Sequence, residues 1–295
     1  MTAGADLKEL ESERTGFPAH GWIGAILAIV FWMLNWGLTG PRTYWAFFPM
    51  WLGYCLTIDG LVVWRTGTSL LTRSWSRYVG LFLLSAPVWW LFEALNLRTQ
   101  NWEYLAVGQF TSFTYAFWTT LSFSTVVPAV FGSAELLSSF DFVKRIGRGP
   151  RIKPEGLAPA AFFIAGWVML GLMLLWPTIF FPFLWISVYF ILEPINIWRG
   201  HRSLADGTRI GDWRPVISLW LGVLLTGFFW EMWNYLSLPK WIYHVPWGNW
   251  LHVFEMPILG YGGYLPFSLE LYAVYHLVTG ILGRRRNDYL RFAFQ

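Results

Sequence analysis

Two glutamates in apolar stretches, Glu93 and Glu231, each precede an asparagine by three residues, Asn96 and Asn234. On a helix this spacing places the carboxyl and the amide on one face, about one turn apart. One carboxyl could hold a proton while the other is ionised, which is the arrangement that general acid–base catalysis needs. The same side chains could instead hydrogen-bond to neighbouring helices and hold two halves of the protein together. Both interpretations fit the sequence equally well.

A tryptophan-rich stretch surrounds the second glutamate and reads "FFWEMWNYLSLPKWIYHVPWGNW" over residues 228–250. Aromatic rings beside a carboxylate can line a pocket, or they can anchor helix ends at the membrane–water interface. Interfacial anchoring explains most of the rings taken singly. The candidates for substrate binding in this stretch are Trp230, Trp233, Trp241 and Tyr243.

A glycine-rich stretch follows and reads "MPILGYGGYLPFSLELY" over residues 256–272. Three glycines between two prolines do not favour a robust helix. Irregular backbone at membrane depth is tolerated where protein buries it or where it lines a cavity. We therefore expect Tyr261, Gly262 and Glu270 to contact a substrate. The alternative is close helix packing through small residues.

Two further acids precede an arginine by six residues: Asp59 precedes Arg65, and Glu193 precedes Arg199. A charged side chain within a membrane span costs roughly 2.5–3.5 kcal/mol on insertion scales, so such groups need a partner. Each arginine lies at the boundary of an apolar stretch. The sequence therefore predicts an ion pair within each couple, or contact with a lipid headgroup.

Histidines are a weaker signal of chemistry. His252 and Glu255 are three residues apart, and His244 or Glu231 could complete a metal site with them. This spacing is loose, so we expect no metal and no cofactor. A histidine acting as the acid–base partner of Glu231 or Glu255 is the favoured alternative, which makes His252 and Glu255 further catalytic candidates. Cys55 is the only cysteine, so an internal disulfide and cysteine-based metal sites are excluded.

The elements that must position these residues are membrane-spanning helices. The chain of 295 residues is 56% apolar and only 13% charged, whereas an average soluble domain is about 25% charged. About 20 apolar residues cross a bilayer as a helix. The fold class predicted is an all-α, polytopic integral membrane protein with eight transmembrane helices, at 22–39, 44–64, 78–97, 111–138, 157–176, 178–198, 215–235 and 251–282. Pro128 and Pro266 predict a kink or break in the two long spans.

The basic residues segregate between alternate loops. Eighteen of the 21 Lys and Arg residues lie in the N-terminal segment, the loops after the second, fourth and sixth spans, and the C-terminal tail. This split predicts that both termini are cytoplasmic, in an inner or plasma membrane. It also explains the basic character without nucleic acid. One cluster could contact anionic lipid headgroups at the cytoplasmic face: Arg199, His201, Arg202, Arg209 and Arg214.

The chain also repeats itself. "DGLVVWRTGTSL" from Asp59 matches "EPINIWRGHRSL" from Glu193, "FEALN" matches "WEMWN", "NWEY" matches "KWIY", and Pro128 matches Pro266, at offsets of 134 to 139 residues. Because a four-helix unit is even, two copies would insert the same way up, as parallel repeats with a site between them. We predict an N-terminal segment (1–21), two four-helix repeats (22–139 and 157–283), a basic linker (140–156) and a basic tail (284–295).

The tandem repeats, the paired intramembrane acids and the aromatic–acid motifs "WWLFE" and "FFWE" resemble the intramembrane carotenoid and terpene cyclases, including the lycopene cyclase domain proteins. The resemblance covers the repeat layout. It implies that a carboxylic acid protonates an isoprenoid double bond or epoxide and that deprotonation quenches the cation, without a metal. It further implies that Glu93 and Glu231 take the places of acid and base.

Three functions remain open at this point. The favoured one is a membrane-embedded enzyme that acts on a lipid or isoprenoid by carboxylate acid–base chemistry, as a cyclase or isomerase does. The second is a transporter of a lipid or small cation, with the glycine-rich eighth span in its path. The third is a structural or assembly subunit of a membrane complex, in which the acids serve only as packing hydrogen bonds.

Overall fold

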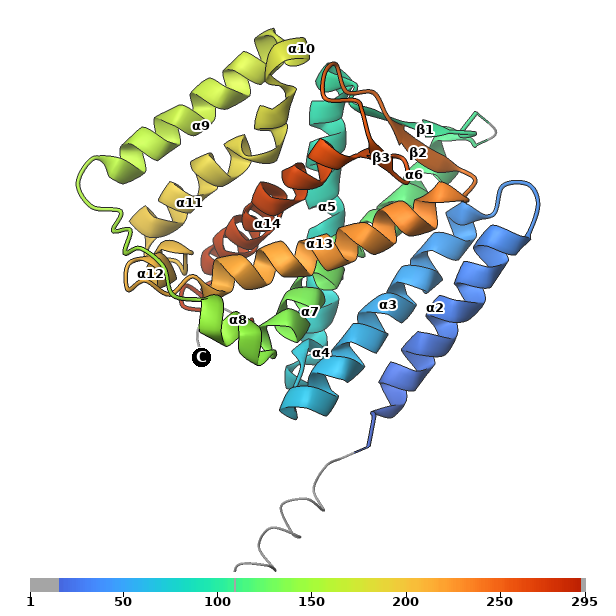
Figure 1. Cartoon of the computed structure of the whole chain (residues 1–295), viewed down its shortest axis with the longest axis horizontal. Helices are drawn as coiled ribbons and strands as arrows, with labels where there is room; N and C mark the ends of the chain where they lie inside the picture. Colours follow the sequence, from blue (N-terminus) through green and yellow to red (C-terminus); the bar gives the residue numbers. More distant parts are fainter. Residues whose placement is uncertain (1–15, 109, 293–295) are drawn as a thin grey trace, which may run out of the picture.

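The computed structural model describes residues 16–108 and 110–292, and the chain is mostly helical (Figure 1). The elements of the first half are α2 (Ala19–Gly37), α3 (Thr43–Thr66), α4 (Leu70–Arg73), α5 (Trp75–Thr99), β1 (Trp102–Leu105), α6 (Ser112–Phe123) and α7 (Val126–Ser138). Helix α8 (Asp141–Ile146) leads to the second half. Its elements are α9 (Ala158–Leu175), α10 (Pro177–Phe180), η1 (Phe181–Trp185), α11 (Ser187–Arg199), α12 (Ala205–Thr208), α13 (Arg214–Tyr235), β2 (Lys240–Tyr243), β3 (His252–Val253), β4 (Met256–Pro257), η2 (Ile258–Gly260) and α14 (Tyr261–Ile281).

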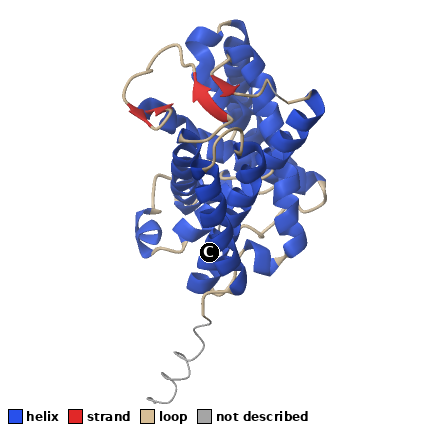
Figure 2. Ribbon diagram, turned by 90° about the vertical axis from the view of Figure 1, so that its right-hand side faces the viewer, coloured by secondary structure: helices blue, strands red, loops and turns tan. Residues whose placement is uncertain are grey.

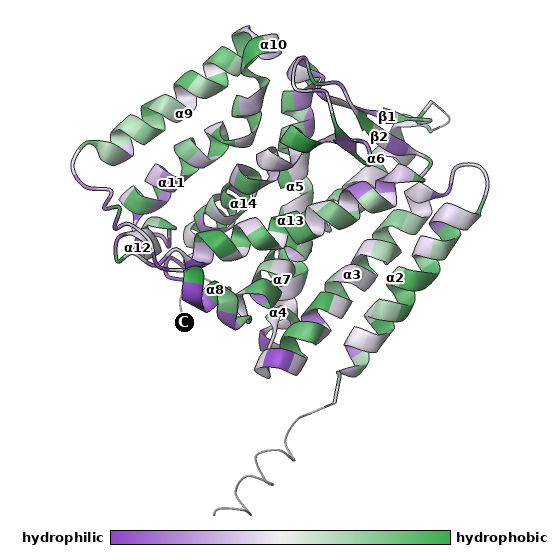
Figure 3. Ribbon diagram, in the orientation of Figure 1, coloured by the Kyte–Doolittle hydropathy of each residue, from purple (hydrophilic) through white to green (hydrophobic). Residues whose placement is uncertain are grey.

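Six helical stretches among the described residues are long and apolar enough to cross a membrane, or seven if the bent pair Pro177–Trp185 and Ser187–Arg199 is one span. These stretches are rich in apolar residues, as the green colouring of the α2 and α9 ribbons shows in Figure 3. Ile26 and Met33 of α2 and Ile164 of α9, for example, are exposed. The helix α14, which covers most of the predicted eighth span, is not among these stretches and contains Glu270 and His276.

The predicted eighth span begins too early. Residues 251–260 form the short β3–β4 hairpin and a turn of 3-10 helix, and the long helix starts only at Tyr261. Gly262 and Gly263 lie inside the first turn of α14, so the irregular backbone predicted for them is wrong. Pro266 lies inside α14, beyond this first turn.

The break predicted near Pro128 is present at Ser124 and Thr125, between α6 and α7. Proline lacks an N–H and its ring clashes with the carbonyl four residues earlier, which is that of Ser124. Ser85 of α5 bridges this break. Its hydroxyl donates to the Phe123 carbonyl at 2.5 Å and accepts from the Val127 N–H at 3.0 Å. A neighbouring helix thus satisfies backbone groups that the break releases.

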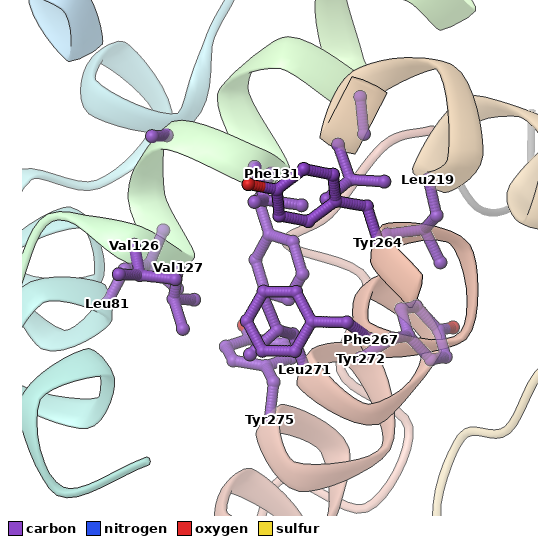
Figure 4. Close-up of a cluster of buried hydrophobic side chains, with 14 of the residues drawn as sticks. Leu81, Val126, Val127, Phe131, Leu219, Tyr264, Phe267, Leu271, Tyr272 and Tyr275 are labelled. Carbon is purple, nitrogen blue, oxygen red and sulfur yellow. The ribbon is translucent and has the colours of Figure 1, made fainter. Parts of the chain in front are cut away.

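The two halves meet along α7 and α13, which pack closely. A Cβ built on Gly222 would lie only 2.5 Å from the backbone nitrogen of Ala134. Around this contact lies the buried core, in which Phe131 of α7 packs near Leu219 of α13 and the aromatic rings of α14 (Figure 4). Equivalent packing occurs within each half: α2 lies against α3 and α9 against α11, while α7 and α14 contact α5 and α13 respectively.

Strands β1 and β2 join the two halves at one end of the molecule (Figure 2). They pair antiparallel, with Trp102 opposite Tyr243 and Tyr104 opposite Trp241. The helices α4, α8 and α12 and the C-terminus lie toward the other end (Figure 1). We call the strand pair the ribbon, and its side of the molecule the ribbon end.

The ion pairs predicted between Asp59 and Arg65 and between Glu193 and Arg199 are wrong. Asp59 is buried and accepts from the Ser69 hydroxyl at 2.6 Å and the Leu71 N–H at 3.0 Å, whereas Arg65 bonds to Ser139. Residues six apart on an α-helix lie about 120° apart around its axis, because each residue turns the helix by about 100°. The acid therefore faces the interior while the arginine faces outward.

Candidate functional site

A cavity of about 160 Å³ lies beneath the ribbon, between the two halves. Both halves contribute to its walls. Most of the lining residues are aromatic, which gives the cavity an apolar interior with a few hydroxyl groups. The lining comprises Thr43, Tyr44, Phe47, Trp89, Trp102, Tyr104, Val107, Phe110, Tyr115, Trp118, Thr119, Ser122, Phe123, Val126, Trp185, Trp230, Pro239, Lys240, Trp241, Tyr243, Met256, Gly260, Gly263 and Tyr264.

Glu93 lies behind one wall of the cavity. Its Oε1 accepts three hydrogen bonds, from Trp89 Nε1 at 2.9 Å, Trp102 Nε1 at 3.1 Å and the Tyr104 hydroxyl at 2.7 Å. All three donors line the cavity, but Glu93 does not. Trp89 lies one helical turn before the glutamate on α5, and β1 supplies the other two donors. The Glu93 carboxyl is therefore connected to the cavity only through its hydrogen bonds to these aromatic side chains.

Glu231 lies behind a second wall and is fully buried. Its Oε1 accepts from the hydroxyls of Tyr243 at 2.7 Å and Tyr264 at 2.6 Å, and both tyrosines line the cavity. Its Oε2 has no hydrogen-bond partner among the described residues. Trp241 Nε1 donates to the Tyr243 hydroxyl at 2.9 Å and extends the network. One carboxyl oxygen is thus held by two phenols while the other is left without a donor.

The tyrosines of the ribbon are in their neutral form. Burial raises the pKa of the Tyr104 hydroxyl, and the Glu93 carboxyl beside it raises this pKa further. Burial and the neighbouring Glu231 raise the pKa of Tyr243 in the same way. Each hydroxyl therefore keeps its proton near neutral pH and donates it to a carboxyl oxygen.

The two asparagines of the Glu-x-x-Asn motifs hold the ribbon and do not line the cavity. Asn96 Nδ2 donates to the Trp102 carbonyl at 2.8 Å, and its Oδ1 accepts from the Asn101 N–H at 2.8 Å. Asn234 Nδ2 donates to the Trp241 carbonyl at 2.7 Å, and its Oδ1 accepts from the Trp241 N–H at 2.9 Å. Their amides therefore position the tryptophan and tyrosine that follow.

Lys240 is the only charged residue among the described residues of the lining, and it pairs with Glu255. Glu255 lies in the loop before α14 rather than in a span, as a counterion at the edge of the cavity. This pair gives one side of the cavity a polar edge that a substrate headgroup could contact.

The proposed metal ligands have separate partners. His252 is exposed and its Nε2 lies 2.9 Å from Asn249 Oδ1, while His244 Nε2 lies 2.8 Å from Glu103 Oε1 across the ribbon. Over residues 16–108 and 110–292, no three His, Cys, Asp or Glu side chains are grouped as a metal would need. His252 is also too exposed to serve as the acid–base partner of the buried Glu231.

Of the residues predicted to bind a substrate, Trp230, Trp241 and Tyr243 line the cavity. Four other candidates do not. Trp233 is buried against Trp51 at a ring distance of 5.0 Å, Tyr261 donates to the Val253 carbonyl, and Gly262 is exposed. Glu270 lies deeper along α14, near the start of α11. These four residues lie on α13 and α14, at positions around each helix that do not face the cavity.

The sequence analysis missed Tyr104 and Tyr264, which are the closest polar contacts between cavity and carboxyls. Tyr104 could have been predicted from the sequence, because the match of "NWEY" to "KWIY" makes it the counterpart of Tyr243. Tyr264 carries no local signal, since only the packing of α14 against α13 brings it to Glu231. Arg214 was placed in the cluster that could contact anionic lipid headgroups. Its side chain instead bonds to Asp212 through two nitrogens.

Comparison of the chain with protein-family models, with curated proteins and with solved structures finds no match.

Proposed function

We propose that this protein is a membrane-embedded enzyme that isomerises or cyclises a lipid or isoprenoid by acid–base chemistry in the aromatic cavity. The observation that carries the proposal is the placement of two carboxyls, Glu93 and Glu231, one from each half of the chain, behind tyrosines that line one apolar cavity. A site that generates a carbocation needs proton donors, a base and aromatic faces that stabilise positive charge. The cavity walls supply tyrosine hydroxyls and aromatic faces, and the two carboxyls lie behind these tyrosines.

The proposed reaction moves two protons and no electrons. The Tyr243 hydroxyl, which donates to Glu231 in the resting site, turns toward the substrate, gives its proton to a carbon of the double bond and takes the proton of a protonated Glu231 carboxyl. The aromatic walls stabilise the resulting cation. A neighbouring carbon then loses a proton to the Tyr104 oxygen, whose own proton passes to the Glu93 carboxylate. Substrate and product are isomers, and exchange with water restores the starting state of the two carboxyls.

The size of the cavity limits what it encloses. A cavity of about 150 Å³ lined by apolar side chains holds a molecule such as benzene. The cavity here therefore accommodates the reacting end of an isoprenoid or a lipid chain, and the remainder of a long substrate extends outside. Lys240 at the edge suits a polar or anionic group on that substrate.

We further propose that the chain forms eight spans in two parallel four-helix repeats. Both termini, and the contacts with anionic lipid headgroups, would then lie on the cytoplasmic side. Matching hydrogen bonds support the repeat. The Leu71 N–H donates to Asp59, and the Ala205 N–H donates to Glu193, at positions 134 residues apart. The ribbon supports it too, because each tryptophan pairs with the tyrosine of the other copy, as a two-fold axis through the ribbon requires.

Solvent deuterium tests the proposed reaction. Membranes that contain the full-length protein are incubated in D₂O, and the isoprenoid fraction is analysed by mass spectrometry. Protonation followed by loss of a different proton predicts a product that carries one deuterium on carbon, absent with Glu231→Gln and retained with the control His252→Ala. An unlabelled isoprenoid pool in all three samples contradicts the reaction.

A transporter is the second candidate, and one observation favours it. The helices on either side of Ile186 meet at a bend of 41°, and broken spans form substrate sites in many transporters. Uptake of a lipid or small cation into vesicles, without deuterium in any product, would favour this alternative.

A further inference from the structure

A second polar cluster lies away from the cavity, toward the end of the molecule that carries α12. It consists of Glu193 on α11 and of Tyr272 and His276 on α14, and we call it the inner cluster. These side chains are 5%, 0% and 1% exposed. The rings of Tyr272 and His276 are 4.3 Å apart, and Asn196, three residues after Glu193 on α11, donates to the Ala273 carbonyl beside Tyr272 at 2.9 Å.

Four polar atoms of the inner cluster have no hydrogen-bond partner among the described residues: Glu193 Oε2, the Tyr272 hydroxyl and both nitrogens of His276. The other oxygen of Glu193 accepts from the Ala205 N–H at 3.2 Å. Leaving a buried polar atom without a partner destabilises the folded state. Four such atoms in one place therefore point to a partner that is not part of the chain, and water is the one that buried polar sites commonly hold.

At the corresponding place in the first half, both oxygens of the acid have hydrogen-bond partners. Asp59, the counterpart of Glu193, has partners for both oxygens in Ser69 and Leu71, and His20 Nε2 lies 3.0 Å from its Oδ2. At the 138-residue offset that relates Pro266 to Pro128, the counterparts of Tyr272 and His276 are Ala134 and Ser138. Only the second half thus combines an incompletely bonded acid with a phenol and an imidazole.

The surroundings of the inner cluster have mixed charge. Arg202 lies within electrostatic reach of Tyr272 and His276, and Asp206 within reach of Tyr272 and Glu193. The titratable or charged groups that face the cluster are Tyr189 on α11, His201 and Arg202 before α12, Asp206 on α12, Tyr275 on α14, and Arg286, which bonds to Asp206. Acids and bases in near balance suit proton transfer better than they suit a metal cation.

We propose that the inner cluster is a proton-exchange site, in which enclosed water connects Glu193, Tyr272 and His276 and passes protons between the imidazole and the carboxyl. The ligand is the proton, exchanged with water at the α12 end of the molecule. Each transfer moves one proton from a His276 nitrogen through water to Glu193 Oε2, or back, with no change of oxidation state. The inference rests on the inner cluster alone and is independent of the chemistry proposed for the cavity.

Deuterium exchange at the C2 carbon of histidine tests this site, because its rate reports both access to water and the protonation of the ring. The full-length protein in lipid nanodiscs is exchanged over a range of pH and digested, and the peptides carrying His276 and His252 are compared by mass spectrometry. A water-connected site predicts exchange of His276 within about tenfold of the exposed His252, whereas a dry site predicts exchange slowed by about a hundredfold or more at every pH.

Variants then test the role of the acid. With Glu193→Gln we expect the midpoint pH of His276 exchange to fall, because the imidazolium loses an anionic neighbour. The matched control is Asp59→Asn, which changes the fully bonded counterpart and should leave His276 unchanged. Slow exchange of His276 in the wild type overturns the proposal by itself. A midpoint unaffected by both Glu193→Gln and Tyr272→Phe overturns the proton transfer between these groups.

Discussion

At the scale of single residues, the tyrosines decide how the carboxyls reach the cavity. Glu93 and Glu231 were the obvious catalytic candidates in the sequence, yet neither lines the cavity. Three tyrosines lie between these glutamates and any molecule bound in the cavity: Tyr104, Tyr243 and Tyr264. In the proposed reaction the glutamates therefore position the phenols and hold protons, and the phenols are the groups that would touch substrate.

This arrangement predicts the effect of removing a single hydroxyl. Tyr243→Phe keeps the ring in the cavity wall and deletes one of the two donors to Glu231, so we expect product formation to fall by about a hundredfold, the lower end for loss of a general acid. Folding should be retained, as judged by the thermal unfolding of the purified protein. Tyr261→Phe is the matched control, because that hydroxyl bonds to Val253 outside the cavity. Equal activity of the two variants would remove Tyr243 from the reaction.

At the scale of elements, hydrophobicity and spacing located the helices, whereas tertiary contacts decided how the side chains are used. The asparagines of the matching "FEALN" and "WEMWN" stretches both bond to the ribbon. Local spacing failed for Asp59 and Arg65, since the partners of Asp59 come from the segment around α4. It also failed for the start of α14, because a short hairpin replaces the first residues of the predicted span.

The contact between α7 and α13 gives a prediction for an element. Gly222→Ala places a methyl group against the Ala134 backbone, and we expect this overpacking to cost about 1–3 kcal/mol of stability. Gly80→Ala on α5 is the control, because a Cβ there meets no atom within 4 Å and alanine favours the helix by about 0.5–1 kcal/mol. Thermal unfolding in detergent, followed by circular dichroism, measures both variants. A Gly222→Ala protein as stable as Gly80→Ala would contradict close packing between the halves.

At the scale of the whole molecule, the two halves resemble each other in their packing and differ in their chemistry. The ribbon end brings matching Glu, Trp and Tyr groups from both halves around one cavity. At the opposite end the two halves differ in hydrogen bonding. The carboxyl oxygens of Asp59 have partners, whereas Glu193 Oε2, near Tyr272 and His276, has none among the described residues. The sequence predicts the repeat, but it does not predict this difference between the ends, because the difference depends on which buried atoms find partners after folding.

The central claim is that the aromatic cavity holds an isoprenoid or lipid between Glu93 and Glu231. Mass spectrometry of the organic extract tests it most directly, using protein purified from its native membrane in mild detergent. The account predicts one discrete isoprenoid or unusual lipid in the wild-type extract, with a lower amount in the extract of Glu231→Gln and an unchanged amount in that of His252→Ala. Bulk phospholipid alone in all three extracts would contradict it.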